Sequence, residues 1–268
     1  MSSKLPLIIA HRGSSAYLPE NTIPAFKLAF EEHHADMIEF DIRWTKEGIP
    51  VVFHDENLER TTNAQGKVSD YSLEELRKFD SGYRFDPVGN QQYPCRGKGF
   101  QIPLFEELLD HFNQKPLAIE IKENSVELTH LLMKLIAKHK NHKNTVIGSE
   151  YACVSKTLRK FYPDQKRFYS KCEITMTLLE KYWPLGPPKK DPFGVASVPI
   201  HYRGIRFDTL SWIRHLHRKN SKAFFWTIDN AEMIRKLAGL GADGIVTNDP
   251  AKTRNILTKK TETVPKDA

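Results

Sequence analysis

Short hydrophobic segments rich in β-branched residues recur along the chain, and most of them are followed by a stretch with helical periodicity. Segments of four to six residues with this composition predict buried strands. The predicted strands are residues 7–11, 37–42, 50–54, 117–122, 145–149, 166–170, 223–228 and 244–247, with a further candidate at 194–200. The predicted helices are residues 23–34, 72–79, 103–113, 126–140, 153–162, 209–220 and 231–241.

The alternation of strands and helices predicts a parallel sheet, and about eight such units predict a single-domain α/β protein with a distorted TIM (β/α)8 barrel. The expected barrel covers residues 5–253, and residues 254–268 are expected to form a flexible tail. Only "RWTKEG" separates the strands at 37–42 and 50–54, which is too short for a helical crossover. An extended or hairpin-like connection is therefore expected there. Residues 82–101 and the proline-rich residues 183–192 are expected to be loop insertions.

The composition is that of an ordinary folded protein, with 40% hydrophobic and 27% charged residues. The net charge of +7 is compatible with nucleic acid, a membrane surface or a phosphorylated metabolite, although a solvated basic surface is the more ordinary explanation. No segment approaches the roughly 20 apolar residues of a membrane span, and the first apolar run is too short for a signal-peptide core. The expected location is the cytoplasm, unless a signal has been removed from the chain.

Charged and ionisable residues gather where the predicted strands end. The carboxyl ends of barrel strands converge on one face, and barrel enzymes have their active sites there. The residues at the ends of four of the strands are His11, Arg12, Glu39, Asp41, His54, Asp55, Glu120 and Lys122. We therefore expect two histidines, several carboxylates and two basic side chains to lie close together.

Glu39 and Asp41 are expected to share one side of their strand, because residues two positions apart in a strand point the same way. Phe40 then points into the helix layer. Two carboxylates inside a barrel repel each other and are costly to desolvate, and a hard divalent cation such as Mg²⁺ or Ca²⁺ relieves both effects. Glu120 is the expected third ligand. The alternative, an ordinary surface strand, is disfavoured by the hydrophobic residues on either side.

His11 and His54 are candidates for the general acid and the general base, because an unperturbed imidazole titrates near neutral pH. Zinc ligation by both histidines is the competing possibility, but a carboxylate trio suits a harder ion. Arg12 and Lys122 supply positive charge at the same face, and both residue types bind phosphate. This combination of groups indicates phosphodiester cleavage.

A series of short motifs resembles that of the glycerophosphodiester phosphodiesterase family. The motifs run from about residue 11 to residue 250 and are "HRG" with "PENT", "EFDI", "VVFHDENLERTT", "IPLFEELL", "LAIEIK", "FWTID" and "GADGIVTNDP". This family has a distorted (β/α)8 barrel and hydrolyses glycerophosphodiesters to an alcohol and glycerol 3-phosphate with Mg²⁺ or Ca²⁺. The resemblance implies this fold, this activity, a small-molecule glycerophosphodiester as substrate and one divalent cation as cofactor.

The resemblance also implies roles for individual residues. They are an acid–base pair of His11 and His54, metal ligands at Glu39, Asp41 and Glu120, phosphate contacts at Arg12 and Lys122, and a pocket wall at Trp226. The chain departs from the family pattern in its two insertions and at Asn248, where an acidic residue is common. These departures bear on the identity of the substrate rather than on the chemistry.

Two other functions remain open at this point. A lysophospholipase D or sphingomyelinase D-like activity on single-chain lipids would use the same site, and Tyr182 and Trp183 beside the proline-rich insertion motivate it. A phosphate-binding or nucleic-acid-binding module would account for the positive charge and would bind without turnover. The complete set of histidines and acids argues against such a module, so no nucleic-acid partner is expected. Which histidine is the acid and which the base stays open.

Overall fold

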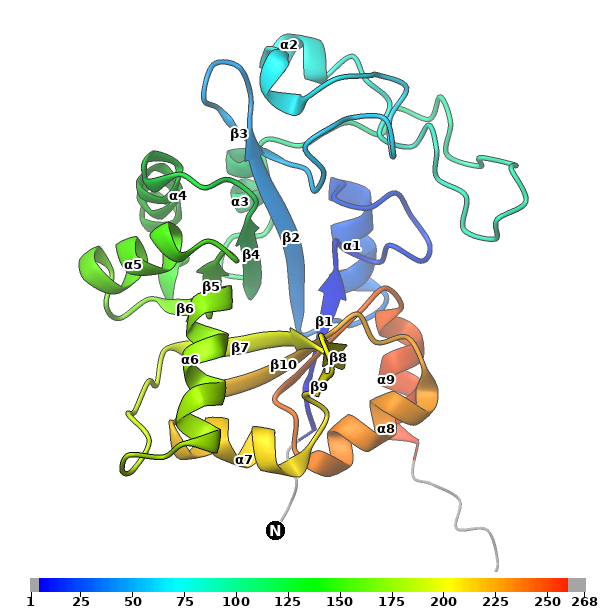
Figure 1. Ribbon diagram of the computed structural model, residues 1–268. Helices are drawn as coiled ribbons and strands as arrows, with labels where there is room; N and C mark the ends of the chain where they lie inside the picture. Colours follow the sequence, from blue (N-terminus) through cyan, green and yellow to red (C-terminus); the bar gives the residue numbers. More distant parts are fainter. Residues whose placement is uncertain (1–4, 260–268) are drawn as a thin grey trace, which may run out of the picture.

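Eight parallel strands form a closed barrel in the computed structural model, which describes residues 5–259 (Figure 1). The barrel strands are β1 (Leu7–His11), β2 (Met37–Trp44), β4 (Leu117–Ile121), β5 (Thr145–Gly148), β6 (Lys166–Phe168), β7 (Gly194–Pro199), β10 (Lys222–Trp226) and β11 (Gly244–Thr247). β1 pairs with β11 on one side and with β2 on the other, which closes the barrel. The predicted single-domain (β/α)8 barrel is therefore confirmed, and the candidate strand at 194–200 belongs to it as β7.

Helices lie around the outside of the barrel (Figure 1). They are α1 (Ile23–Glu31), α2 (Leu73–Leu76), α3 (Phe105–His111), α4 (Val126–Lys138), α5 (Ala152–Phe161), α6 (Lys171–Tyr182), α7 (Leu210–Arg218), α8 (Ala231–Leu240) and α9 (Pro250–Thr258), with short 3-10 helices at Val68–Asp70 and His142–Asn144. Within residues 5–259, none of the helices has the length and apolar character needed to cross a membrane.

The sequence patterns predict seven of these helices but miss α6 and α9. Thr177 is the only fully buried residue of α6, so this helix lacks the continuous apolar stripe that identifies an amphipathic helix. α9 begins after the N-cap residue Asp249 and ends at Thr258. The expected domain boundary at residue 253 therefore falls inside a helix. Residues 260–268 of the expected tail lie outside the described part of the chain.

The barrel is irregular after β2, as the short connection predicts. β3 (Pro50–Val52) pairs antiparallel to β2 in a hairpin, and the chain then passes through α2 and the insertion at 82–101 before it reaches α3 (Figure 1). A second hairpin of β8 (His201–Tyr202) and β9 (Ile205–Arg206) follows β7. All of these segments leave the carboxyl ends of strands, and we call this end of the barrel the carboxyl end.

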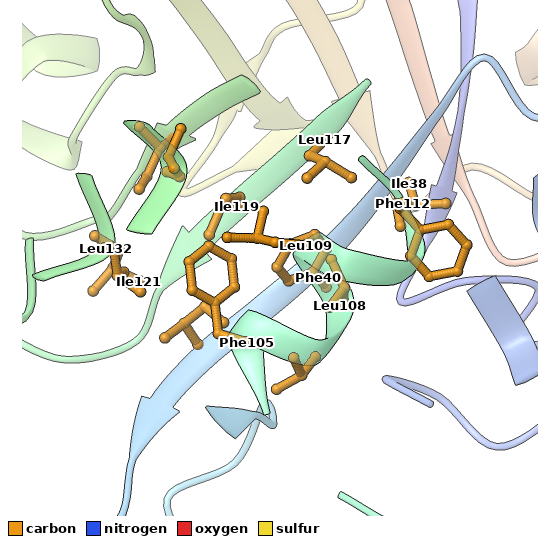
Figure 2. Packing of buried hydrophobic residues seen from close by; sticks show 14 of the residues in the cluster. Ile38, Phe40, Phe105, Leu108, Leu109, Phe112, Leu117, Ile119, Ile121 and Leu132 are labelled. Carbon is orange, nitrogen blue, oxygen red and sulfur yellow. The ribbon is translucent and has the colours of Figure 1, made fainter. Parts of the chain in front are cut away.

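Alternate residues of the strands face either the barrel interior or the helix layer. The interior has an apolar layer made of Ile9, Met37, Ala118, Val146, Phe168, Val195, Phe224 and Val246. On the outer side of β2, Phe40 packs against Phe26 of α1 and Phe105 of α3, with ring centroids 5.8 and 6.2 Å apart. Figure 2 shows Phe40 and Phe105 in the layer between the sheet and α3. The predicted outward direction of Phe40 is therefore confirmed.

The variant Phe105→Ala is expected to lower the free energy of unfolding by about 3–5 kcal/mol, because it removes a fully buried aromatic ring and leaves a cavity. Denaturant and thermal unfolding measure this loss. Phe161→Ala is the matched control, since Phe161 is 53% exposed on α5 and its truncation should change stability little. Equal losses in the two variants would contradict the assignment of Phe105 to the core.

Candidate active site

The polar residues predicted at the strand ends lie in the barrel at its carboxyl end, one layer beyond the apolar interior. His11 of β1 is in register with Glu39 of β2, and Asp41 of β2 is in register with Glu120 of β4. Glu39 and Asp41 share the interior side of β2, as their spacing predicts, and they are only 7% and 1% exposed. The register of three strands thus places these acids next to the first histidine.

Three of these acids form a cluster whose chemistry fits a cation. Glu39, Asp41 and Glu120 each offer a carboxylate oxygen, and the three oxygens lie within 4.8 Å of one another. Burial and the neighbouring Asp41 carboxylate raise the pKa of Glu39 well above its usual range. Crowded, buried carboxylates with no nitrogen or sulfur ligand among them suit a hard divalent cation.

Arg12 and Lys122 balance the charge of this cluster. Arg12 Nε lies 3.1 Å from Asp41 Oδ2, while Lys122 Nζ lies 3.1 Å from Asp41 Oδ1 and 2.9 Å from Glu120 Oε1. Burial opposes ionisation of Asp41, but the charges of Lys122 and Arg12 outweigh it and lower the pKa of Asp41 to about 2. In return, the carboxylates raise the pKa of both basic side chains against the opposing effect of burial. Both cations are therefore held at the site in charged form.

The loop between β1 and α1 braces the cluster. Asn21 Nδ2 donates a hydrogen bond of 3.0 Å to Asp41 Oδ2. Glu20 accepts hydrogen bonds of 2.8 Å from Arg12 Nη1 and from Arg60 Nη1. Residues of the "PENT" segment thus fix the orientation of one acid and one base of the site.

The two histidines have different partners on their Nδ1 atoms. His11 Nδ1 lies 2.8 Å from Asn248 Oδ1, and His54 Nδ1 lies 2.6 Å from Asp55 Oδ1. Burial, assisted by the positive charge of Arg12, lowers the pKa of His11. The hydrogen bond from His54 holds the pKa of Asp55 well below its usual range despite partial burial. In both rings the Nδ1 contact leaves Nε2 as the atom for proton transfer.

Two clefts open beside these residues. One, of about 560 Å³, is lined by His54, Glu120 and Lys122 among others. The other, of about 390 Å³, is lined by Asn248 and Asp229 and reaches residues 84–87 of the insertion that follows β3. The insertion at 82–101 therefore borders the site.

Trp226 lies at the same end of the barrel, but it does not line either of these clefts. It follows the interior residue Phe224 by two positions on β10 and is 44% exposed. Trp226 is therefore placed at the rim of the barrel mouth, and its role as a pocket wall remains a prediction.

The proline-rich insertion at 183–192 lies away from the site. α6 starts just after the carboxyl end of β6, so its other end, with Tyr182 and Trp183, leads to the beginning of β7 at the opposite end of the barrel (Figure 1). These two aromatic residues therefore give no support to a lipid substrate at the site.

Two further polar residues, Asp229 and Asn248, follow the last two barrel strands. Asn248 contacts His11, and Asp229 contacts Asn248. Asn248 directly follows β11, and Asp229 lies three residues beyond the end of β10, so a search for polar residues close to the carboxyl ends of the last two barrel strands would have found both.

Two histidines beside a buried carboxylate cluster at the carboxyl end of a barrel are the arrangement expected of a barrel phosphodiesterase, and the comparison with known proteins shows the family. The model of the glycerophosphoryl diester phosphodiesterase family matches residues 11–252. The chain belongs to this family, and as an enzyme it falls in the class of the phosphoric diester hydrolases. The resemblance noted in the sequence is thereby confirmed.

The curated relatives align over almost their whole length. The glycerophosphodiester phosphodiesterase of Bacillus subtilis is 40% identical over 266 residues, which cover 91% of this chain and 84% of the relative. The glycerophosphodiester phosphodiesterase of Caldanaerobacter subterraneus subsp. tengcongensis is 34% identical over 263 residues, with 94% and 98% covered. Lysophospholipase D GDPD3 of Mus musculus is 27% identical, with 95% and 85% covered.

Solved structures show the same fold. The glycerophosphoryl diester phosphodiesterase domain of a Mycobacterium tuberculosis protein superposes with a TM-score of 0.83 at 17% identity and covers 94% of this chain and 99% of that one. A phosphodiesterase of Oleispira antarctica in complex with the product sn-glycerol-3-phosphate superposes with a TM-score of 0.76 at 22% identity and covers 95% and 98%.

Addition of Mg²⁺ or Ca²⁺ near neutral pH is expected to raise the melting temperature, because a ligand that binds only the folded state stabilises it. The increase should shrink at acidic pH, since the raised pKa of Glu39 leaves a proton on the carboxyl that the cation must displace. Thermal unfolding with and without the cation measures both effects. The double variant Glu39→Gln, Asp41→Asn should lose the increase.

Glu74→Gln is the matched control, because Glu74 is an exposed acid of α2 that pairs with Lys78. This variant should keep the full increase in melting temperature. An undiminished increase in a folded double variant would place the cation elsewhere.

Proposed function

We propose that the protein hydrolyses glycerophosphodiesters to an alcohol and glycerol 3-phosphate. The observation that carries this proposal is the pair of histidines, each with its Nδ1 atom engaged, beside acids and bases that suit a metal-assisted reaction at phosphate. Membership of the family and the names of two relatives support it. The product bound to the Oleispira antarctica enzyme agrees with it.

Glu39, Asp41 and Glu120 would hold one divalent cation, Mg²⁺ or Ca²⁺, which supplies positive charge against a phosphate oxygen and acidifies a bound hydroxyl. Arg12 binds the phosphate as a fork of N–H donors, and Lys122 acts on it as a point charge. Because both side chains are largely buried and held in place by their carboxylate partners, they stabilise the negative charge that develops on the phosphate oxygens.

The surroundings of the two histidines support different roles for them. His11 is buried, its Nδ1 faces a neutral amide and its pKa is lowered, so its Nε2 lone pair takes the proton of the attacking hydroxyl while that oxygen bonds to phosphorus. His54 Nδ1 faces Asp55, whose lowered pKa keeps it a negatively charged hydrogen-bond acceptor. His54 therefore gives its Nε2 proton to the leaving alcohol oxygen as the other P–O bond breaks. Two titratable groups in such different environments are suited to act as base and acid in one reaction.

The test is release of choline from glycerophosphocholine, and of ethanolamine from glycerophosphoethanolamine, with and without a chelator. His11→Ala and His54→Ala should each lower kcat by about 10²–10⁴-fold, because each removes one proton transfer. His142→Ala is the control, since His142 precedes β5 at the opposite end of the barrel. No release of either alcohol with Mg²⁺, Ca²⁺ or Mn²⁺ would refute the proposed activity.

A second candidate function is the hydrolysis of lysophospholipids at the same site. Two exposed aromatic side chains, Trp226 on β10 and Tyr202 on the β8–β9 hairpin, lie at the carboxyl end of the barrel and offer apolar surface to an acyl chain. The mouse relative named a lysophospholipase D supports this candidate.

Trp226→Ala separates the two candidates. If an acyl chain lies on this rim, the variant should lower kcat/KM for lysophosphatidylcholine about tenfold, in keeping with one buried aromatic contact, and should change kcat/KM for glycerophosphocholine much less. Trp183→Ala is the matched control, because Trp183 is exposed at the other end of the barrel. Equal effects of Trp226→Ala on both substrates would exclude an acyl site at the rim.

A further inference from the structure

Asp229 and Asn248 form a hydrogen-bonded pair behind His11. Asn248 Nδ2 donates to Asp229 Oδ2 over 2.7 Å, and Asn248 Oδ1 lies 2.8 Å from His11 Nδ1. The pair therefore connects the loop after β10 to the end of β1 through the residue that follows β11.

The orientation of the Asn248 amide follows from the partners of Asp229. Asp229 Oδ1 already accepts hydrogen bonds from Thr247 Oγ1, over 2.7 Å, and from the backbone N–H of Asn248, over 2.8 Å. An ionised carboxylate only accepts hydrogen bonds, so the group that faces Asp229 Oδ2 must be a donor. Asn248 must therefore turn its NH₂ group to Asp229 and its carbonyl oxygen to His11.

The same reasoning extends to the imidazole ring. A carbonyl oxygen also only accepts, so His11 Nδ1 must carry a hydrogen, and the lone pair of the neutral ring is then on Nε2. We propose that Asp229, acting through Asn248, is a positioning residue that fixes His11 in the tautomer with its basic nitrogen at Nε2. This inference rests on the proposed role of His11 as the base.

A neutral amide has an advantage over a carboxylate at this position. The ends of β1 and β2 already bring His11 close to the carboxylates of Glu39 and Asp41. An amide between Asp229 and the ring holds the imidazole in one orientation and adds no further negative charge beside that cluster. Mutation of a residue that hydrogen-bonds the second nitrogen of a functional imidazole commonly lowers activity by about 10–100-fold.

Asp229→Asn tests the pair. The new amide can still accept from Thr247 and from the Asn248 N–H through its oxygen, and its NH₂ group then faces Asn248. Asn248 is expected to turn over and present its own NH₂ group to His11 Nδ1, which moves the ring hydrogen to Nε2. We expect kcat to fall about 100-fold or more with KM nearly unchanged, because substrate contacts are intact while the base is in the wrong tautomer.

¹⁵N NMR of protein whose histidines carry ¹⁵N measures the tautomer directly. The His11 signals are assigned by their absence in His11→Ala. The wild-type ring should show hydrogen on Nδ1, and Asp229→Asn should show it on Nε2. Asn248→Leu removes both the donor to Asp229 and the acceptor for His11 Nδ1, so its kcat should also fall. Asn141→Ala is the control for loss of a buried amide, since Asn141 lies before β5 at the other end of the barrel and bonds the Lys115 carbonyl.

A wild-type ring with its hydrogen on Nε2 would overturn the inference, and so would wild-type kcat in both Asp229→Asn and Asn248→Leu. A protein that releases no alcohol from any glycerophosphodiester would instead refute the proposed function. The tautomer measurement needs no turnover, so it tests the orientation of His11 even in that case.

Discussion

The burial of two carboxylates side by side on β2 is the constraint on which the rest of the site depends. Glu39 and Asp41 are nearly inaccessible to water, and their mutual repulsion adds to the cost of desolvation. Arg12 and Lys122 offset this cost from the neighbouring strands. A barrel interior gains little stability from such a charged cluster compared with apolar packing. Its presence is therefore explained by the chemistry of the site rather than by folding.

The hydrophobic core fixes the geometry of this cluster through the two-residue period of a strand. Phe40 is held in the helix layer by rings from α1 and α3, so Glu39 and Asp41 must face inward. A shift of one residue in the pairing of β2 would exchange the two faces and place the acids in the helix layer. The packing of α1 and α3 therefore determines which residues of β2 enter the carboxylate cluster.

The sequence predicts those features that depend on local pattern. Alternating segments identify the barrel, and the polar residues after apolar runs identify His11, Glu39 and Glu120 as neighbours. The sequence pattern misses features that depend on distant pairing, such as the contact of His11 with Asn248, which is 237 residues away. It also misses α6, whose sparse burial gives no amphipathic signal. The location of the 183–192 insertion, by contrast, could have been predicted from the sequence. A segment that follows a helix and precedes a strand lies at the end of the barrel where strands begin, away from the site.

The same physical problem explains why the two histidines have unlike partners. Both lie among the same carboxylates and basic groups. In the proposed reaction, however, one ring must accept a proton and the other must donate one. Asp55 places a negative charge against His54 Nδ1, whereas Asn248 offers a neutral carbonyl oxygen to His11 Nδ1. A carboxylate next to both rings, or an amide next to both, would give the two histidines the same kind of partner. One amide and one carboxylate thus give the two rings the unlike surroundings that the proposed division into base and acid requires.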